Sequence, residues 1–148
     1  MNLTFYIKNP RDLFELLLKD YEDYQKDKLS VRKALNCVFK CWHLIDWISE
    51  YKGLDLFELR KNILDECSEL GIMHDICNGL KHYKITRPKS DIDDSILHEG
   101  TFDSTFDSTF DISSLQLISE NGDKYNLDSV INNVIDYWTE YFNHFSEN

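Results

Sequence analysis

Residues 34–48, ALNCVFKCWHLIDWI, set the architecture because they form the middle of a long amphipathic helix. Apolar side chains recur there every three or four residues, which predicts a helix over residues 31–51 with a wide apolar stripe. Ser30 is placed to cap the first turn, and Gly53 to end the last. A stripe this wide has to be covered by other helices, so it predicts a helical bundle. The stripe consists of Ala34, Leu35, Val38, Cys41, Trp42, Ile45 and Ile48.

Four more helices are predicted around this one, over residues 10–26, 55–69, 72–83 and 129–145. Asn9, Asp55 and Asp128 are the expected caps, because short polar side chains accept hydrogen bonds from the free N–H groups of a first turn. The fold class is therefore mainly α, a single domain of about five helices over residues 1–148. Its expected parts are a four-helix core (1–87), an acidic loop, Phe-rich arm and hairpin (88–127), and a closing helix (128–148).

A small β-hairpin is expected just before the last helix. Residues 114–119 and 124–127 are short runs of β-formers that flank the sequence ENGD. Asn121-Gly122 between such runs is a strong hairpin signal, because both residues accept a positive φ. Residues 89–100, KSDIDDSILHEG, are polar and rich in turn formers, and they predict a mobile loop.

The net charge of −11 is confined to one part of the chain. Acidic and basic side chains balance over residues 1–87, whereas residues 88–148 carry only Lys89 and Lys124 against 13 acidic side chains. Nucleic-acid binders usually present a basic face, which only the first 87 residues could supply. The acidic part is either a solvated surface or a surface for a basic partner.

The cysteines and the apolar runs indicate a cytoplasmic protein. The four cysteines lack the paired spacing of a zinc ribbon, and we expect buried free thiols. No apolar run reaches the length of about 18 residues that a membrane helix needs, so no membrane association is expected. The start of the chain, MNLTFYIKNPRD, does not have the pattern of a signal peptide.

Residues 101–111, TFDSTFDSTFD, repeat a four-residue unit. We interpret the repeat as an extended arm whose phenylalanines anchor on the bundle or, if exposed, bind a partner. One alternative is that the repeat is a duplicated stretch of a disordered loop with no function. A calcium site is another, although aspartates four apart on a strand are too distant to share one ion. The candidate binding residues are Phe102, Phe106, Phe110, Asp103, Asp107 and Asp111.

Polar side chains interrupt the apolar stripes of two predicted helices. His43 and Asp46 lie three apart on one helix, and Asp75, Asn78 and His82 share a face of another. We expect these five to converge in one hydrogen-bonded cluster. The cluster is a structural network, an acid–base site or a metal site with His43, Asp46, Asp75 and His82 as ligands. Of these we favour the network, and we expect neither metal nor cofactor.

The stretches ALNCVFKCWHLIDWI and HDICNGLKHYKI also carry a resemblance. They resemble a family of small, mostly uncharacterised bacterial and phage helical proteins with a D-I-x-N-G-x-K-H motif. The layout is distantly similar to HEPN domains, many of which are ribonucleases of toxin–antitoxin and phage-defence systems. Their motif is an arginine, usually followed by a polar residue, with a histidine four to six residues on. Here Asn78 precedes His82, and Ile76-Cys77 stand where the motif has its arginine. The resemblance implies a ribonuclease with His82, Asn78, Lys81 and Asp75 as catalytic residues.

Two functions remain in view. The favoured one is a small acidic interaction or regulatory protein, in a bacterium–phage conflict system, that binds a partner with a basic or nucleic-acid-binding surface. A homodimer is the other assembly considered. The alternative is the HEPN-like ribonuclease, and RNA is a partner only in that case. Whether the chain is an enzyme stays open at this point.

Overall fold

Helix α2 (Val31–Lys52) is the central element of this computed structural model, which describes residues 3–101 and 111–147. Both predicted ends are confirmed. The Ser30 side chain accepts a hydrogen bond from the backbone N of Lys33, and Gly53 ends the helix with a left-handed φ of 66°. The apolar stripe is buried as expected, except that Leu35 is only half-buried.

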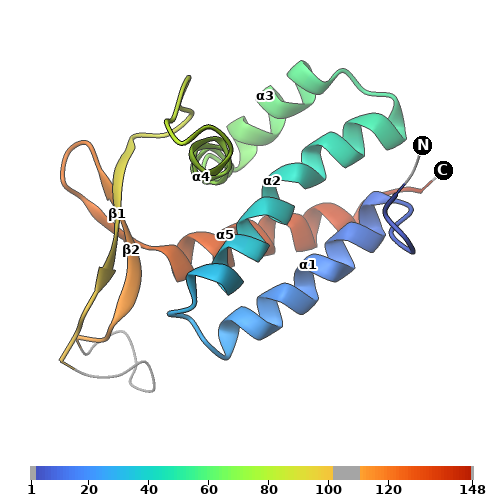
Figure 1. Ribbon diagram of the computed structural model, residues 1–148. Helices are drawn as coiled ribbons and strands as arrows, with labels where there is room; N and C mark the ends of the chain where they lie inside the picture. Colours follow the sequence, from blue (N-terminus) through green and yellow to red (C-terminus); the bar gives the residue numbers. More distant parts are fainter. Residues whose placement is uncertain (1–2, 102–110, 148) are drawn as a thin grey trace.

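Helices α1 (Pro10–Gln25) and α5 (Leu127–Asn143) run alongside α2 and cover its stripe (Figure 1). Phe14 of α1 stacks on Phe142 of α5 with ring centroids 4.7 Å apart. Trp138 of α5 is fully buried, and its Nε1 donates to the backbone O of Cys41 over 3.0 Å. This bond satisfies the polar atom of the largest core side chain, so it fixes how α5 lies against α2.

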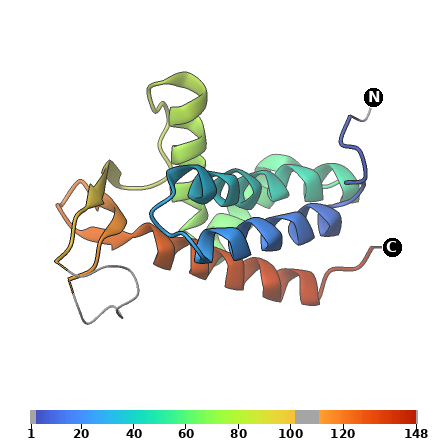
Figure 2. The same ribbon diagram turned by 60° about the horizontal axis from the view of Figure 1, so that its bottom comes forward.

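Helices α3 (Leu56–Glu66) and α4 (Leu70–His82) follow on the other side of α2. Asp55 caps α3 as predicted, because its side chain accepts from the backbone N of Glu58. Figure 2 shows α4 standing across the three long helices rather than beside them. It ends at Tyr83, whose φ of 66° is unusual for a residue with a Cβ. The crossing leaves the last turns of α4 projecting into solvent.

A three-stranded antiparallel sheet precedes α5, in the order β1-β2-β3. The predicted hairpin is confirmed as β2 (Ser114–Ser119) and β3 (Lys124–Asn126), with Gly122 at a φ of 85° in the turn. The predicted loop is wrong over part of its length, because residues 92–98 form strand β1 (Ile92–His98). Its polar stretch lacks a clear two-residue pattern, and it becomes a strand through pairing with β2.

The start of α5 also differs from the prediction. The helix begins directly after β3, with Asn126 at the cap position and no side-chain capping bond. Asp128 is therefore not the cap. It lies in the first turn, where it accepts from Gln25 over 3.1 Å and pairs with Lys28 over 3.2 Å. A carboxylate there still favours the helix, because it faces the positive end of the helix dipole.

The predicted fold class is confirmed: the chain is mainly α, with a small sheet before the last helix. Within residues 3–101 and 111–147, no helix combines the length and apolar character needed to cross a bilayer.

Candidate functional site

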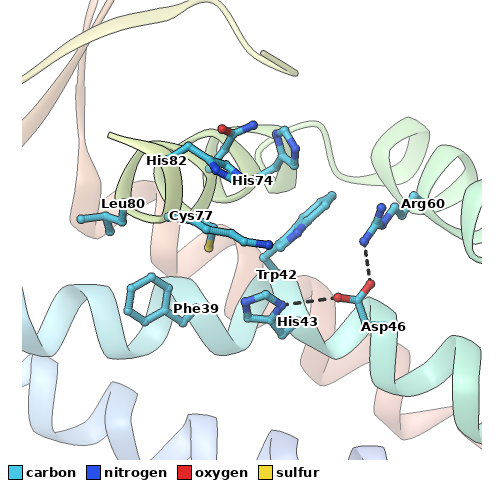
Figure 3. A pocket seen from close by; sticks show the side chains of 11 residues that line it. Phe39, Trp42, His43, Asp46, Arg60, His74, Cys77, Leu80 and His82 are labelled. Atoms are coloured by element: carbon cyan, nitrogen blue, oxygen red, sulfur yellow. Dashed lines mark hydrogen bonds and ion pairs between the residues drawn. The ribbon is translucent and has the colours of Figure 1, made fainter. Parts of the chain in front are cut away.

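An open cleft of about 480 Å³ lies where α4 crosses α2. We call it the α2–α4 cleft. Its apolar lining comes from both helices, with Phe39, Trp42, Cys77 and Leu80. Its polar side chains come from α2, α3 and α4: His43, Asp46, Arg60, His74, Asn78, Lys81 and His82. Figure 3 shows His74 and His82 on the α4 side and His43 on the α2 side.

His74 is the most firmly oriented imidazole of the cleft. Its Nδ1 lies 2.8 Å from Oδ1 of Asp75, a carboxylate that is only 3% exposed. An imidazole donates to a carboxylate, so Nδ1 carries the proton and Nε2 is left as a proton acceptor. The ring also contacts Trp42 edge-on, with centroids 4.9 Å apart.

Asp75 is held in turn by the loop that follows α4. The backbone N of Lys89 donates to Oδ1 over 2.8 Å, and the Ser90 hydroxyl donates to Oδ2 over 2.5 Å. A buried carboxylate with several donors is stabilised in place. Asp75 therefore links the loop at residues 89–90 to the orientation of His74.

A second group faces His74 from α2 and α3. Asp46 accepts from Nη2 of Arg60 over 2.7 Å and lies 3.4 Å from Nδ1 of His43. Burial by itself would raise the pKa of Asp46, but the hydrogen bonds from His43 and Arg60 hold that pKa below its ordinary value. The Arg60 guanidinium also lies 5.4 Å from the Trp42 ring centre, a cation–π distance.

Asn78 has a structural partner. Its Nδ2 donates to the backbone O of Thr86 over 2.7 Å, and its Oδ1 accepts from the backbone N of Thr86 over 3.4 Å. Both ends of the amide thus hold the loop after α4. Lys81 and His82 are exposed and make no hydrogen bond or ion pair with any residue of the described ranges.

The single hydrogen-bonded cluster predicted from the sequence is not formed. Four of the five predicted residues line the α2–α4 cleft: His43 and Asp46 from α2, and Asn78 and His82 from α4. In the described part of the chain, no hydrogen bond joins the two α2 residues to the two α4 residues. Asp75 is on another side of α4, where it lines a separate groove. Trp42, Arg60 and His74 also line the cleft, and they were not predicted as site residues from the sequence.

The metal site considered for His43, Asp46, Asp75 and His82 does not fit this geometry. Among residues 3–101 and 111–147, no three histidine, cysteine, aspartate or glutamate side chains are placed to hold one ion. Asp75 is also occupied by three donors of its own.

The four cysteines are free, as expected, and three of them are buried. Cys77 is the exception, because it is half-buried and lines the cleft. Burial raises the pKa of the Cys77 thiol to about 12. A thiol with so high a pKa is protonated at neutral pH, so Cys77 is not an activated nucleophile.

Most of the TFDS repeat lies outside the described residues, including Phe102, Phe106, Phe110, Asp103 and Asp107. Asp111 is described, and it is exposed. It accepts from Nε2 of His98 over 2.7 Å and from the backbone N of Thr101 over 3.2 Å. Asp111 therefore ties the end of the repeat to its beginning and to β1.

Comparisons of the chain with protein-family models, with curated proteins and with solved structures find no match.

Proposed function

We propose that the α2–α4 cleft binds RNA and cleaves it by general acid–base chemistry. One observation carries the proposal: three imidazoles and Lys81 line one cleft, and one of the imidazoles is oriented by a buried carboxylate. Cleavage of RNA needs a base, an acid and positive charge near the phosphate, because the nucleophile is the substrate's own hydroxyl. The cleft has candidates for all three roles.

His74 is the base in this proposal and His82 is the acid. Nε2 of His74 takes the proton of a ribose 2′-hydroxyl, and the 2′-oxygen attacks the phosphorus. The bond from phosphorus to the 5′-oxygen breaks, and a protonated His82 gives its proton to that oxygen. The products are a 2′,3′-cyclic phosphate and a free 5′-hydroxyl, so protons and charge balance.

The remaining residues of the predicted catalytic set have other roles here. Lys81 stabilises the phosphate charge. Arg60, which was not in the predicted set, adds a guanidinium from α3, and α4 itself contains no arginine. Asp75 acts through His74 as a positioning residue, and Asn78 positions the loop at Thr86.

Incubation with a structured RNA tests this proposal. We expect the wild type to release products with a cyclic phosphate, and His74→Ala and His82→Ala to lower kcat by about 10²–10⁴-fold. His144→Ala is the matched control, because this histidine is exposed near the end of α5 and lies outside the cleft. Intact RNA after incubation with the folded wild type would overturn the proposal.

We also propose the interaction function that the sequence analysis favoured, and a specific surface supports it. Around the three-stranded sheet, the exposed acidic side chains outnumber the exposed lysines, Lys89 and Lys124. We call this surface the acidic sheet; its acidic residues are Asp91, Asp93, Asp94, Glu99, Asp111, Glu120 and Asp123. Its partner in this proposal is a protein with a basic or nucleic-acid-binding surface. The bacterium–phage setting, which the resemblance implies, and the cytoplasmic location, which the cysteines and the start of the chain favoured, remain part of the proposal.

Binding of a lysine-rich peptide tests the interaction function. We expect an affinity that falls as the ionic strength rises, because exposed charges more than about 10 Å apart are screened at 0.1 M salt. An affinity equal to that of a glutamate-rich peptide would contradict it.

A further inference from the structure

A second groove, of about 380 Å³, lies next to the cleft, and Leu80 lines both. We call it the α4–β1 groove. It is bounded by α4, by the first turns of α2 and by strand β1. Its lining includes the apolar side chains Val31, Leu80, Tyr83 and Ile85 and the charged side chains Asp93 and Asp94.

Four of the apolar side chains that line the groove are exposed. Val31 and Leu80 are each 54% exposed, Ile85 is 47% exposed and Tyr83 is 92% exposed. Single exposed apolar side chains are common on proteins, but a group of large ones beside a groove is typical of an interaction site. Tyr83 follows the last turn of α4 and has a φ of 66°.

Strand β1 adds backbone to the same groove. It pairs with β2, and no further strand pairs with it among the described residues. The free edge of a sheet presents N–H and C=O groups, which an extended peptide can bind as an added strand. The Ser95 N–H in this stretch donates to Oδ1 of Asp94 over 2.7 Å, so an added strand has to displace that contact. Ile92, Asp93, Asp94 and Ser95 are the part of β1 that lines the groove.

The charged side chains of the groove indicate which kind of partner it binds. Besides Asp75, which is occupied by its own donors, the charged side chains that line the groove are Asp93 and Asp94, and both are exposed. A second copy of this chain is disfavoured, because antiparallel pairing of two β1 strands would bring like charges together. A basic segment with apolar side chains would instead meet both the carboxylates and the apolar walls.

We infer that the α4–β1 groove binds an extended segment of a partner protein that alternates lysine or arginine with apolar residues. The segment adds a strand to the free edge of β1. Its basic side chains meet Asp93 and Asp94, and its apolar side chains lie against Leu80, Tyr83 and Ile85. This inference rests on the proposed interaction function, and it names the place of binding and the class of partner.

The probe for the test is a short fluorescent peptide that alternates lysine with valine, measured by fluorescence anisotropy with the full chain. The test variant is Asp93→Lys with Asp94→Lys. The matched control is Glu120→Lys with Asp123→Lys, which changes the net charge equally at the β2–β3 turn, whose side chains do not line the groove. The single substitutions Asp93→Lys and Glu120→Lys repeat the comparison if a double variant is misfolded by circular dichroism.

We expect the test variant to weaken binding by about tenfold or more and the control by under about threefold. Tyr83→Ser should also weaken binding, whereas its exposed position should leave folding intact. N-methylation of alternate peptide bonds should abolish binding, because it removes the donors of an added strand.

The outcomes separate this inference from the function on which it rests. Equal losses in the Asp93/Asp94 and Glu120/Asp123 variants would overturn the groove while leaving the acidic sheet as a binder of basic partners. Binding that is unchanged by Tyr83→Ser and by N-methylation would also overturn it. An absence of binding by the wild type would remove both the inference and the interaction function.

Discussion

Gly71 at the start of α4 lies against the backbone carbonyl of Lys89, so closely that a Cβ on Gly71 would be 2.4 Å from that oxygen. No side chain fits in this space. The close approach lets the loop at residues 89–90 reach Asp75 with a backbone N–H and a hydroxyl. A glycine that carries no chemistry therefore supports the orientation of His74 in the cleft.

Gly71→Ala should destabilise the protein. The added methyl group forces the loop away from α4, and overpacking of this kind costs about 1–3 kcal/mol. Gly79→Ala is the control on the same helix, because its Cβ meets only the side chain of Ile85, at 3.2 Å. Alanine favours a helix by about 1 kcal/mol over glycine, so Gly79→Ala should be neutral or stabilising. Urea unfolding measures both, and equal effects would show that the loop is not held at Gly71.

Asp75→Ala should cost about 1–3 kcal/mol of the free energy of unfolding, because it leaves the buried donors of the loop without an acceptor. Asp46→Ala is the comparison, since its partners are partly exposed and such pairs contribute about 0–1 kcal/mol. Thermal unfolding should show the larger decrease in Tm for Asp75→Ala. A larger decrease in Tm for Asp46→Ala would contradict the expectation that Asp75 contributes more to stability than Asp46.

The stabilising effect of Asp46 should depend on pH in one direction. Its pKa in the folded chain lies below the ordinary value of 3.8, so folding favours the ionised form. The stabilisation is present above pH 3.8 and is lost as the pH falls through the lower folded pKa. Asp46→Asn should thus be less stable than the wild type at pH 7, by at most about 1 kcal/mol. The gap should close below about pH 4, as measured by urea unfolding across that range; a gap that widens on acidification would contradict the assignment.

The thiols should resist alkylation while the chain is folded. Burial raises the pKa of Cys37 and of Cys77 to about 12, and that of Cys41 also rises well above its usual value. Because the thiolate is the reacting form, iodoacetamide at pH 8 should label these residues slowly until denaturant is added. Mass spectrometry of the modified chain measures this. Rapid labelling of Cys77 in the folded protein would reveal an ionised thiol in the cleft.

Sequence patterns located the helices because their signals are local. The stripe of α2, the caps at Asn9, Ser30 and Asp55, and the turn at Asn121-Gly122 each depend on residues a few positions apart. Strand β1 could not be predicted in this way. Its residues alternate poorly, and they form a strand because β2 supplies the hydrogen-bonding partners.

Only part of the candidate site could be predicted from the sequence. The sequence pattern predicted Asp75 on the face of Asn78 and His82. Helical spacing would equally have allowed His74, since positions three and four residues away are both neighbours on a helix. The angle at which α4 crosses α2 decides between them, so that His74 lines the cleft and Asp75 turns to the loop at Lys89. Arg60 joins the cleft only because α3 folds back beside α2. Spacing along one helix determines which residues share a face, whereas contacts between distant segments determine what that face meets.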